Sequence, residues 1–310
     1  MDFIQGPVQP VQTNWSSINL FIKRLDLIDS WASGNKYYKL KYNIKFALEQ
    51  GITTIVSKGG IFSNHLDALA KACHYFGLKC VCIVRSYTED LLSPTVKTLQ
   101  SYRAEIVYMN PPSFDAFDLD EANEKYPGAL FIPEGGSNYM GIKGAGEIID
   151  ELQDYNPTHV IIAGGSMSSA AGIIQAAWPE VKIIIVPAWK GCTSDYMQDF
   201  LDKNSIEIKS NWELWPDYHF GGFGKTNNEL FEFMFEFTQQ YKIPLDPVYT
   251  GKLMFAIRDK TRSGYFNPTD KVIAIHTGGL QGIAGYVYRK PEVWGKYAEM
   301  LAVQGLAYTN

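Results

Sequence analysis

Short apolar runs and longer helical patterns alternate along most of the chain, and this alternation constrains the fold more than any other sequence feature. Strands separated by helices of ten or more residues are typical of βαβ units, in which neighbouring strands run parallel. The expected strands are 53–57, 79–84, 105–109, 129–132, 159–163, 182–186 and 272–276. The expected helices after the first of these strands are 64–76, 94–102, 144–152, 168–177, 229–240 and 252–259. We therefore expect an α/β fold with mainly parallel, twisted sheets flanked by helices.

Three segments fall outside this alternation. Residues 1–20 are rich in Pro and Gln, and we expect them to lie along the surface. Residues 19–27 alternate in polarity, which predicts a strand at the edge of a sheet. Residues 212–224 are rich in aromatic residues and Gly, which favours a loop or short strands.

The composition limits the partners of the protein. A chain of 310 residues with 46% hydrophobic and 20% charged residues is typical of a soluble globular protein with a large core. The formal net charge of −5 and the lack of a long basic run argue against a nucleic acid or an anionic membrane surface as the main partner. No apolar run reaches the roughly eighteen residues that a membrane-spanning helix needs.

The four cysteines indicate a reducing compartment. No Cys-x-x-Cys pair occurs, and Cys80 and Cys82 lie in an apolar run where we expect them to fill the core. Residues 1–7 lack the charged and apolar regions of a signal peptide, so we expect the cytoplasm. No grouping of His, Cys, Asp or Glu has the spacing of metal ligands, so no metal site is expected.

Residues 33–40, Ser-Gly-Asn-Lys-Tyr-Tyr-Lys-Leu, place a lysine at the start of a helix. Asn35 is suited to be the N-cap. Lys36 would then lie at the positive end of the helix dipole, which disfavours its ammonium form, and an amine of lowered pKa suits Schiff-base chemistry with a carbonyl. The simpler interpretation is that Lys36 and Lys39 are solvated lysines on an amphipathic helix, and from this segment alone that interpretation is favoured.

Two glycine-rich turns each follow an expected strand and open a helix. In residues 163–169, Ala-Gly-Gly-Ser-Met-Ser-Ser, backbone N–H groups and hydroxyls could form a phosphate cradle, but a plain strand-to-helix turn explains the pattern equally well. This turn is neither a P-loop nor a dinucleotide fingerprint. In residues 58–65, Ser63, Asn64 and His65 cluster at a helix start, where they could bind a carboxylate or relay protons. Helix capping by Ser63 or Asn64 is the simpler interpretation there.

Residues 276–279, His-Thr-Gly-Gly, end the last expected strand at its carboxyl side. Open α/β sheets bind ligands beyond the carboxyl ends of their strands. His276 by itself is expected to be a hydrogen-bonded structural residue.

Six segments together give the chain a resemblance that none of them carries alone. It resembles the pyridoxal-phosphate enzymes of the tryptophan-synthase-β type (fold type II), in the branch of 1-aminocyclopropane-1-carboxylate (ACC) deaminases and D-cysteine desulfhydrases. The matching segments are 34–40, 59–65, 135–138, 165–169, 246–252 and 276–279. The resemblance implies a two-domain protein, with a small α/β domain of residues 51–135 inserted into a large cofactor-binding domain of residues 1–50 and 136–310. It also implies pyridoxal phosphate as cofactor, a small amino acid as substrate, and a homodimer.

The resemblance assigns roles to single residues. Lys36 resembles the lysine that binds the cofactor covalently and moves protons at the substrate Cα, with Ser63 and Tyr249 assisting proton transfer. Cofactor contacts are implied for Lys36, Asn64, Gly165, Ser166, Met167, Ser168, Ser169 and Thr277. Substrate contacts are implied for Ser63, Asn64, His65, Tyr249 and Thr250. Lys39, one turn after Lys36, keeps the interpretation of a solvated lysine.

Two threonines favour one branch of the family. ACC deaminases have glutamate at the position of Thr250 and leucine at that of Thr277, whereas the desulfhydrases have hydroxyl residues there. A carboxylate beside the pyridine nitrogen makes the ring a stronger electron sink, which opening a cyclopropane needs, while a leaving thiolate takes the electrons itself. We therefore expect β-elimination from D-cysteine, giving pyruvate, sulfide and ammonia. The alternatives are an ACC deaminase, giving 2-oxobutanoate and ammonia, and a non-catalytic ligand-binding protein on the same scaffold.

Three residues depart from the family pattern. Phe223 stands where both branches have a second active-site tyrosine, so one hydroxyl is lost and the substrate can differ. Met167 and Ser168 alter the phosphate turn, which is richer in glycine and threonine in relatives.

Overall fold

The computed structural model describes residues 4–15, 18–28, 30–88 and 92–306. The strands are β1 (Val8–Pro10), β2 (Asn19–Arg24), β3 (Thr54–Gly60), β4 (Lys79–Arg85), β5 (Glu105–Met109), β6 (Leu130–Ile132), β7 (His159–Gly164), β8 (Lys182–Pro187), β9 (Trp212–Leu214) and β10 (Lys271–His276). The helices are α1 (Asn35–Glu49), α2 (Asn64–Phe76), α3 (Pro94–Ser101), α4 (Pro111–Ala116), α5 (Leu119–Lys125), α6 (Tyr139–Asp150), α7 (Ser168–Ala176), α8 (Ser194–Lys203), α9 (Asn228–Tyr241), α10 (Thr250–Arg262), α11 (Gly282–Arg289) and α12 (Pro291–Val303). Within the described ranges, no helix is both long and apolar enough to cross a membrane.

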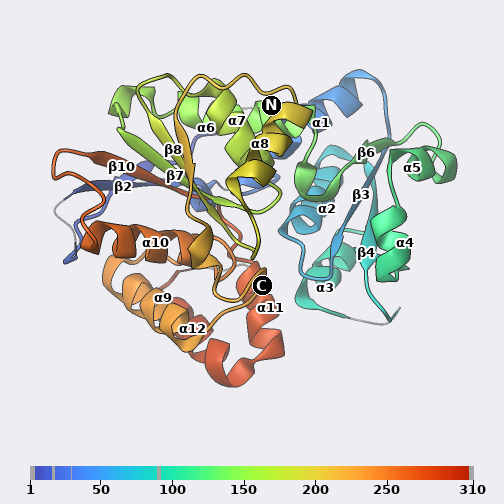
Figure 1. Ribbon diagram of the computed structural model, residues 1–310. Coiled ribbons are helices and arrows are strands. Elements are labelled where there is room, and N and C mark those ends of the chain that lie inside the picture. Colours follow the sequence, from blue (N-terminus) through green and yellow to red (C-terminus); the bar gives the residue numbers. More distant parts are fainter. Residues whose placement is uncertain (1–3, 16–17, 29, 89–91, 307–310) are drawn as a thin grey trace.

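These elements form two sheets that lie side by side, with helices packed around them (Figure 1). The larger sheet has the strand order β1-β2-β10-β7-β8-β9, and the smaller sheet has the order β5-β4-β3-β6. Among the described strands, every pair runs parallel except β1 with β2. The expected α/β fold with mainly parallel sheets is confirmed.

The central strands of the larger sheet are buried along nearly their whole length. In β7, β8 and β10, all residues after the first are buried. Helices cover both faces: α6, α7 and α8 lie on one side of this sheet, and α9, α10 and α12 lie on the other (Figure 1). Parallel strands buried on both faces must be apolar throughout rather than alternating, which explains their continuous Ile and Val runs.

The prediction of an edge strand over residues 19–27 is wrong in two respects. β2 lies between β1 and β10, because Lys23 pairs with Val8 on one side and with Ile275 on the other. Residues 25–27 form a turn of 3-10 helix instead of continuing the strand. The beginning of the chain therefore supplies its own edge strand, β1, in addition to lying along the surface.

Several helices of the structure were not predicted from the sequence. α4 and α5 have 6 and 7 residues, too few for helical periodicity to show. Each nevertheless has an N-cap signal, since Asn110 and Asp118 accept hydrogen bonds from backbone N–H groups of the first turn. α8, α11 and α12 were also missed. In α11, Gly285 weakens the helical pattern but is needed, because a Cβ there would lie 2.6 Å from the Phe62 ring.

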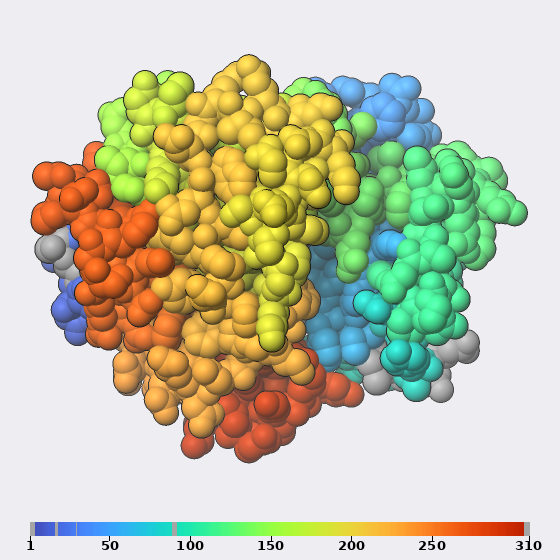
Figure 2. Space-filling view, in the orientation of Figure 1, coloured from blue at the N-terminus to red at the C-terminus, as the bar shows by residue number. Residues whose placement is uncertain are grey.

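The smaller sheet is formed by residues 54–132, within the segment predicted to be an inserted domain. The larger sheet is formed by strands from the remainder of the chain. The space-filling view is hollowed where the yellow segments of the larger part meet the green-blue segments of the smaller part (Figure 2). The boundaries at residues 51 and 135 stay a prediction.

α1 and α6 pack with their backbones almost in contact, so a methyl group between them should destabilise the protein. A Cβ on Gly144 of α6 would lie 2.0 Å from the carbonyl oxygen of Tyr38. We expect Gly144→Ala to lower the free energy of unfolding by about 1–3 kcal/mol or more, measured by urea denaturation. Gly295→Ala in α12 is the matched control, because nothing lies within 4 Å of its Cβ position. That variant should gain up to about 1 kcal/mol from helix propensity, and equal effects of the two changes would contradict the packing argument.

Candidate active site

A cleft of about 660 Å³ lies where the carboxyl ends of strands from both sheets converge. It is lined by Gly60 at the end of β3, Gly164 at the end of β7 and Thr277 just after β10. Its mouth lies in the hollow of Figure 2, between the two parts of the chain. The carboxyl ends of parallel strands are the usual ligand-binding edge of such sheets.

The predicted site residues largely meet in this cleft. It is lined by Lys36, Ser63, Asn64, His65, Gly165, Ser166, Met167, Ser169, Tyr249 and Thr277. Ser168 and Thr250 are not part of the lining. These residues come from the start of α1, the β3–α2 turn, the β7–α7 turn, the start of α10 and the end of β10.

The first turn of α1 is held against the end of β10 by backbone contacts. Gly34 is the N-cap residue, with φ 63°, and a Cβ on it would lie 2.3 Å from the carbonyl oxygen of Thr277. The N–H of Asn35 donates to that same oxygen at 3.0 Å. The expectation that Asn35 caps the helix is wrong, because its side chain instead donates to Ser169 Oγ at 3.0 Å. The start of α1 is thus tied to both the β10 end and the β7–α7 turn.

Lys36 extends from this turn into the cleft. Burial lowers the pKa of its side chain to about 8, and the cause is desolvation rather than the helix dipole that the sequence suggested. Within the described part of the chain, no hydrogen bond or ion pair to its ammonium is found. At neutral pH a useful fraction of this amine is unprotonated and free to react with a carbonyl.

Lys39 also faces the cleft, and the prediction that it is a solvated surface lysine is wrong. Its side chain is 1% exposed. Its Nζ donates to Ser168 Oγ at 2.6 Å and to Ser166 Oγ at 3.3 Å. Burial, followed by the charge of Lys36, lowers the pKa of Lys39. A buried ammonium bonded only to neutral hydroxyls is stabilised by an anion, so this end of the cleft suits an anionic group.

The β7–α7 turn supplies the rest of an anion site. Met167 has φ 60°, in the left-handed region, and turns the chain into α7. A Cβ on Gly165 would lie 2.9 Å from the Tyr249 ring, so only glycine allows this approach. The hydroxyls of Ser166 and Ser168 lie 2.9 Å apart beside Lys39. Hydroxyls, a helix N-terminus and an ammonium together have the chemistry of a phosphate cradle.

The β3–α2 turn combines helix capping with an open face on the cleft. Ser63 is the N-cap of α2, and its Oγ accepts from the N–H of Leu66 at 3.2 Å. The Asn64 side chain lies against the loop after β10, because a Cβ on Gly279 would come within 2.8 Å of its Nδ2. The predicted capping role of Ser63 is therefore present, and both residues also line the cleft.

Tyr249 and Phe223 form the opposite wall. Their rings meet edge to face, with an interplanar angle of 69° and centroids 6.1 Å apart. Burial, followed by the nearby Asp246 carboxylate, raises the pKa of Tyr249, so its hydroxyl keeps its proton at neutral pH. Phe223 lines the cleft, at the place where the family resemblance implies a second tyrosine, and adds an apolar surface.

The predicted contact between Thr250 and the substrate is not supported by its position. Thr250 is fully buried beneath the wall, and its hydroxyl donates to Asp246 Oδ2 at 2.7 Å. The other oxygen of Asp246 accepts from the N–H groups of Val248 and Tyr249, both at 2.9 Å. Thr250 therefore shapes the start of α10, whereas Thr277 lines the cleft.

Lys252 is a positioning residue that the motif contained but sequence reasoning did not use. It is fully buried, and its Nζ donates to the carbonyl oxygens of Ala188, His219 and Gly222 at 2.9, 2.8 and 2.9 Å. Burial lowers its pKa to about 8. These three bonds anchor the glycine-rich loop that carries Phe223.

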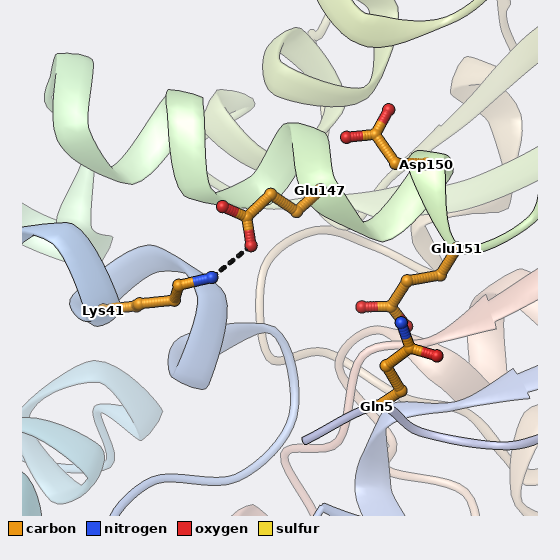
Figure 3. A pocket seen from close by; sticks show the side chains of 5 residues that line it. All are labelled: Gln5, Lys41, Glu147, Asp150 and Glu151. Atoms are coloured by element: carbon orange, nitrogen blue, oxygen red, sulfur yellow. Dashed lines mark hydrogen bonds and ion pairs between the residues drawn. The ribbon is translucent and has the colours of Figure 1, made fainter. Parts of the chain in front are cut away.

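A second cavity, of about 390 Å³, lies between α1 and α6 (Figure 3). It is lined by Gln5, Lys41, Glu147, Asp150 and Glu151. Its charges are largely paired, since Lys41 bonds Glu147 and Lys23 lies 2.5 Å from Glu151. The described residues include no cluster of three His, Cys, Asp or Glu that could hold a metal ion. We assign no function to this cavity.

Comparison with known proteins agrees with the geometry of the cleft. The family model described as "pyridoxal-phosphate dependent enzyme" matches residues 7–278. The chain is 29% identical over 295 residues to the D-cysteine desulfhydrase of Klebsiella pneumoniae subsp. pneumoniae, covering 86% of this chain and 88% of that protein.

Solved structures share the fold. An ACC deaminase homologue superimposes with a TM-score of 0.80 at 21% identity, covering 94% of each chain. A hydrogen sulfide-producing enzyme from Fusobacterium nucleatum gives a TM-score of 0.63 at 15% identity, covering 88% of this chain and 93% of that one. The expected fold type and family resemblance are confirmed.

The desolvated side chain of Lys36, partly buried in the cleft, should make the stability of the protein without ligand depend on pH. Its pKa is about 8 in the fold and 10.5 ordinarily. Below pH 8 the amine is charged in both the folded and the unfolded protein. As the pH rises from 8 toward 10.5, the folded protein releases this proton first. The free energy of unfolding therefore increases by up to about 3 kcal/mol over this range. Urea denaturation between pH 8 and pH 10.5 should show that Lys36→Met lacks the part of the rise in the free energy of unfolding that is due to Lys36. Lys45→Met, which changes an exposed lysine of α1, should keep it, and identical pH slopes in all three proteins would contradict the assignment.

Proposed function

The chain belongs to the pyridoxal-phosphate-dependent enzymes, and we propose that it is a lyase that eliminates a β-substituent from a small amino acid. D-Cysteine is the proposed substrate, with pyruvate, sulfide and ammonia as products. The observation that carries the proposal is a pair of lysines in one cleft, of which Lys36 is partly buried and Lys39 is buried. Lys36 offers a free amine of lowered pKa, and Lys39 offers an ammonium on a hydroxyl-lined turn.

The residues of the cleft fit pyridoxal phosphate. Lys39, Ser166, Ser168 and the N–H groups that open α7 would hold the phosphate, because this cradle brings hydroxyls and a buried cation together. Lys36 would bind the aldehyde carbon. Asn64 would flank the ring and Thr277 would face the pyridine nitrogen, since both line the same cleft.

When bound, pyridoxal phosphate draws electrons away from the Cα of the amino acid, which makes the Cα proton acidic and lets the β-substituent leave. Ser63 and the N-terminus of α2 bind the substrate carboxylate. Lys36 takes the Cα proton. Burial raises the pKa of Tyr249, so its hydroxyl stays protonated and can donate a hydrogen bond to the departing sulfur, which leaves as a thiolate. The enamine that is released reacts with water to give the keto acid and ammonium.

The choice of β-elimination rests on Thr277 and on the curated relative. Thr277 places a neutral hydroxyl in the cleft at the end of β10, where the family resemblance implies a hydroxyl residue in desulfhydrases and leucine in ACC deaminases. When the residue beside the pyridine nitrogen is neutral, the ring is a weaker electron sink. A weaker sink is sufficient for a substrate whose leaving group itself takes the electrons. The 29% identical relative is a D-cysteine desulfhydrase. The alternative is ACC deamination to 2-oxobutanoate and ammonia, which the fold shared with an ACC deaminase homologue keeps open. A non-catalytic binding protein is the remaining alternative.

We further propose that the enzyme is a homodimer of the cytoplasm. The compartment is supported by the cysteines, which are all free and buried. The homodimer rests on the family resemblance.

Lys39→Met should weaken pyridoxal phosphate binding about 10- to 100-fold, because the phosphate loses a buried charge-assisted hydrogen bond. Titration of the cofactor-free protein, followed by the visible absorbance of the bound cofactor, measures this. Lys36→Ala should abolish that absorbance. Lys45→Met is the control on the same helix and should bind normally. Undiminished binding by Lys39→Met would argue against the proposed phosphate site.

Incubation of the holoenzyme with D-cysteine should release sulfide and pyruvate in equal amounts. Because the Cα proton transfer depends on its amine, Lys36→Ala should lower the rate by at least about 1,000-fold. Sulfide and keto acids are measured with D-cysteine, L-cysteine and ACC in parallel. Formation of 2-oxobutanoate from ACC without sulfide from D-cysteine would replace the proposed reaction with the alternative.

A further inference from the structure

Phe223 is an exposed apolar side chain within the candidate active site. It lines the cleft, and its side chain is 60% exposed. A single exposed apolar side chain is ordinary on the outer surface of a protein. Within a ligand-binding cleft, however, apolar and aromatic side chains are the usual contacts of the ligand. The uncovered ring of Phe223 therefore indicates an apolar part of the ligand.

The loop that carries Phe223 is fixed on both sides of this residue. Gly222 and Gly224 have φ of 126° and 65°, in the region that favours glycine, so the chain turns sharply around Phe223. The carbonyl oxygen of Gly222 accepts from Lys252 Nζ at 2.9 Å. The carbonyl oxygen of Gly224 accepts from the Tyr286 hydroxyl at 2.9 Å. The ring thus projects from an anchored backbone, as a preorganised binding surface requires.

Phe223 also lies beside the place from which the leaving group departs. In the proposed reaction, the Tyr249 hydroxyl contacts the departing sulfur. The rings of Phe223 and Tyr249 meet edge to face with centroids 6.1 Å apart, so a group attached to that sulfur can extend over Phe223. D-Cysteine carries only a hydrogen on its sulfur and leaves the Phe223 ring uncovered. The remaining space suits a larger substituent.

The aromatic surface continues from this loop toward the smaller sheet. Tyr286, whose hydroxyl is bonded to the loop, and Phe62 both line the cleft. The guanidinium carbon of Arg289 lies 4.7 Å from the ring centroid of each of them. A guanidinium held against two rings extends the aromatic surface. We therefore expect this side of the cleft to favour an apolar group over an anionic one.

We propose that the substrates include D-cysteines with an apolar alkyl group on the sulfur, and that Phe223 binds this group. The inference rests on the proposed function and names its substrate class. The Cα proton passes to Lys36, the Cβ–S bond breaks, and the sulfur keeps the electron pair and leaves as a thiolate. The thiolate takes up a proton, and the released enamine reacts with water. One substrate and one water thus give a thiol, pyruvate and ammonium, with no oxidation or reduction.

Turnover of S-benzyl-D-cysteine by the holoenzyme tests the substrate class. It should give pyruvate and benzyl thiol in equal amounts. The ratio of kcat/KM for S-benzyl-D-cysteine to that for D-cysteine should fall about 10- to 100-fold in Phe223→Ala, because the benzyl group loses the ring that covers it. Phe223→Leu keeps an apolar side chain and should restore most of this ratio. Tyr75→Ala removes a ring that is 68% exposed outside the cleft, and it should leave the ratio unchanged.

Equal ratios in all four proteins would overturn the proposal. S-Carboxymethyl-D-cysteine tests the preference for an apolar group. A higher kcat/KM for this compound than for S-benzyl-D-cysteine would also overturn the proposal, because the surface would then favour an anion.

A second measurement reports on Phe223 without turnover. 3-(Benzylthio)propanoate has no amino group and cannot react with the cofactor in place of the substrate. In calorimetric titrations of the holoenzyme, its Kd should be about 10- to 100-fold lower than that of 3-(methylthio)propanoate. Phe223→Ala should remove most of this difference, and Tyr75→Ala should keep it.

The two measurements separate the proposal from the proposed function. A Phe223-dependent difference in Kd without pyruvate from either cysteine would support the apolar surface and refute the elimination. Sulfide and pyruvate from D-cysteine, with no effect of Phe223→Ala on either the ratio or the Kd values, would refute the surface and keep the elimination. Unchanged Kd values together with a smaller oligomer in Phe223→Ala would show that the ring is a contact between subunits, which would overturn the proposal.

Discussion

The constraint on which the rest of the site depends is the placement of two lysines in one cleft, Lys39 buried and Lys36 partly buried. Lys36 and Lys39 lie one helical turn apart, and burial lowers the pKa of both. No described carboxylate pairs with either ammonium. A protein of net charge −5 thus concentrates positive charge where its strands end. Such an arrangement is costly without an anionic ligand and favourable with one, because a phosphate supplies the missing counter-charge.

Backbone contacts and one side-chain hydrogen bond hold the helical turn that carries these lysines. The absence of a side chain at Gly34 lets α1 begin directly against Thr277, and Asn35 bonds to both Thr277 and Ser169. These contacts hold together three parts of the chain that are far apart in sequence. The wall opposite is held in a similar way, since Lys252 bonds three carbonyl oxygens around the loop that carries Phe223. Both sets of contacts fix the geometry of a cleft whose lining is largely made of turns.

The same side chains serve the fold and the site at the β3–α2 turn. Ser63 caps α2 while facing the cleft, and His65 is tied to β3 through Ser57 while its second nitrogen stays free. For such residues the simple structural interpretation and the functional interpretation are not alternatives. A helix N-terminus beside a strand end offers N–H groups to a ligand and requires caps for the helix at once.

The sequence by itself determined the α/β fold, the order of most strands and helices, and a set of predicted site residues most of which line the cleft. Hydrophobic periodicity and turn-forming residues are local properties of the sequence, so they can be recognised without the structure. The helix α2, for example, was predicted with its observed bounds, Asn64–Phe76. The tertiary structure alone decided which lysine is buried, which residue caps α1 and which threonine reaches the cleft. Lys39 and Asn35 were misjudged because their partners, Ser168 and Ser169, are brought to them by the packing of other elements. Thr250 was misjudged because its burial beneath the cleft wall depends on the tertiary structure. Burial and hydrogen bonding between distant segments are not properties of a residue's own neighbourhood in sequence, and they set the pKa values on which the chemistry depends.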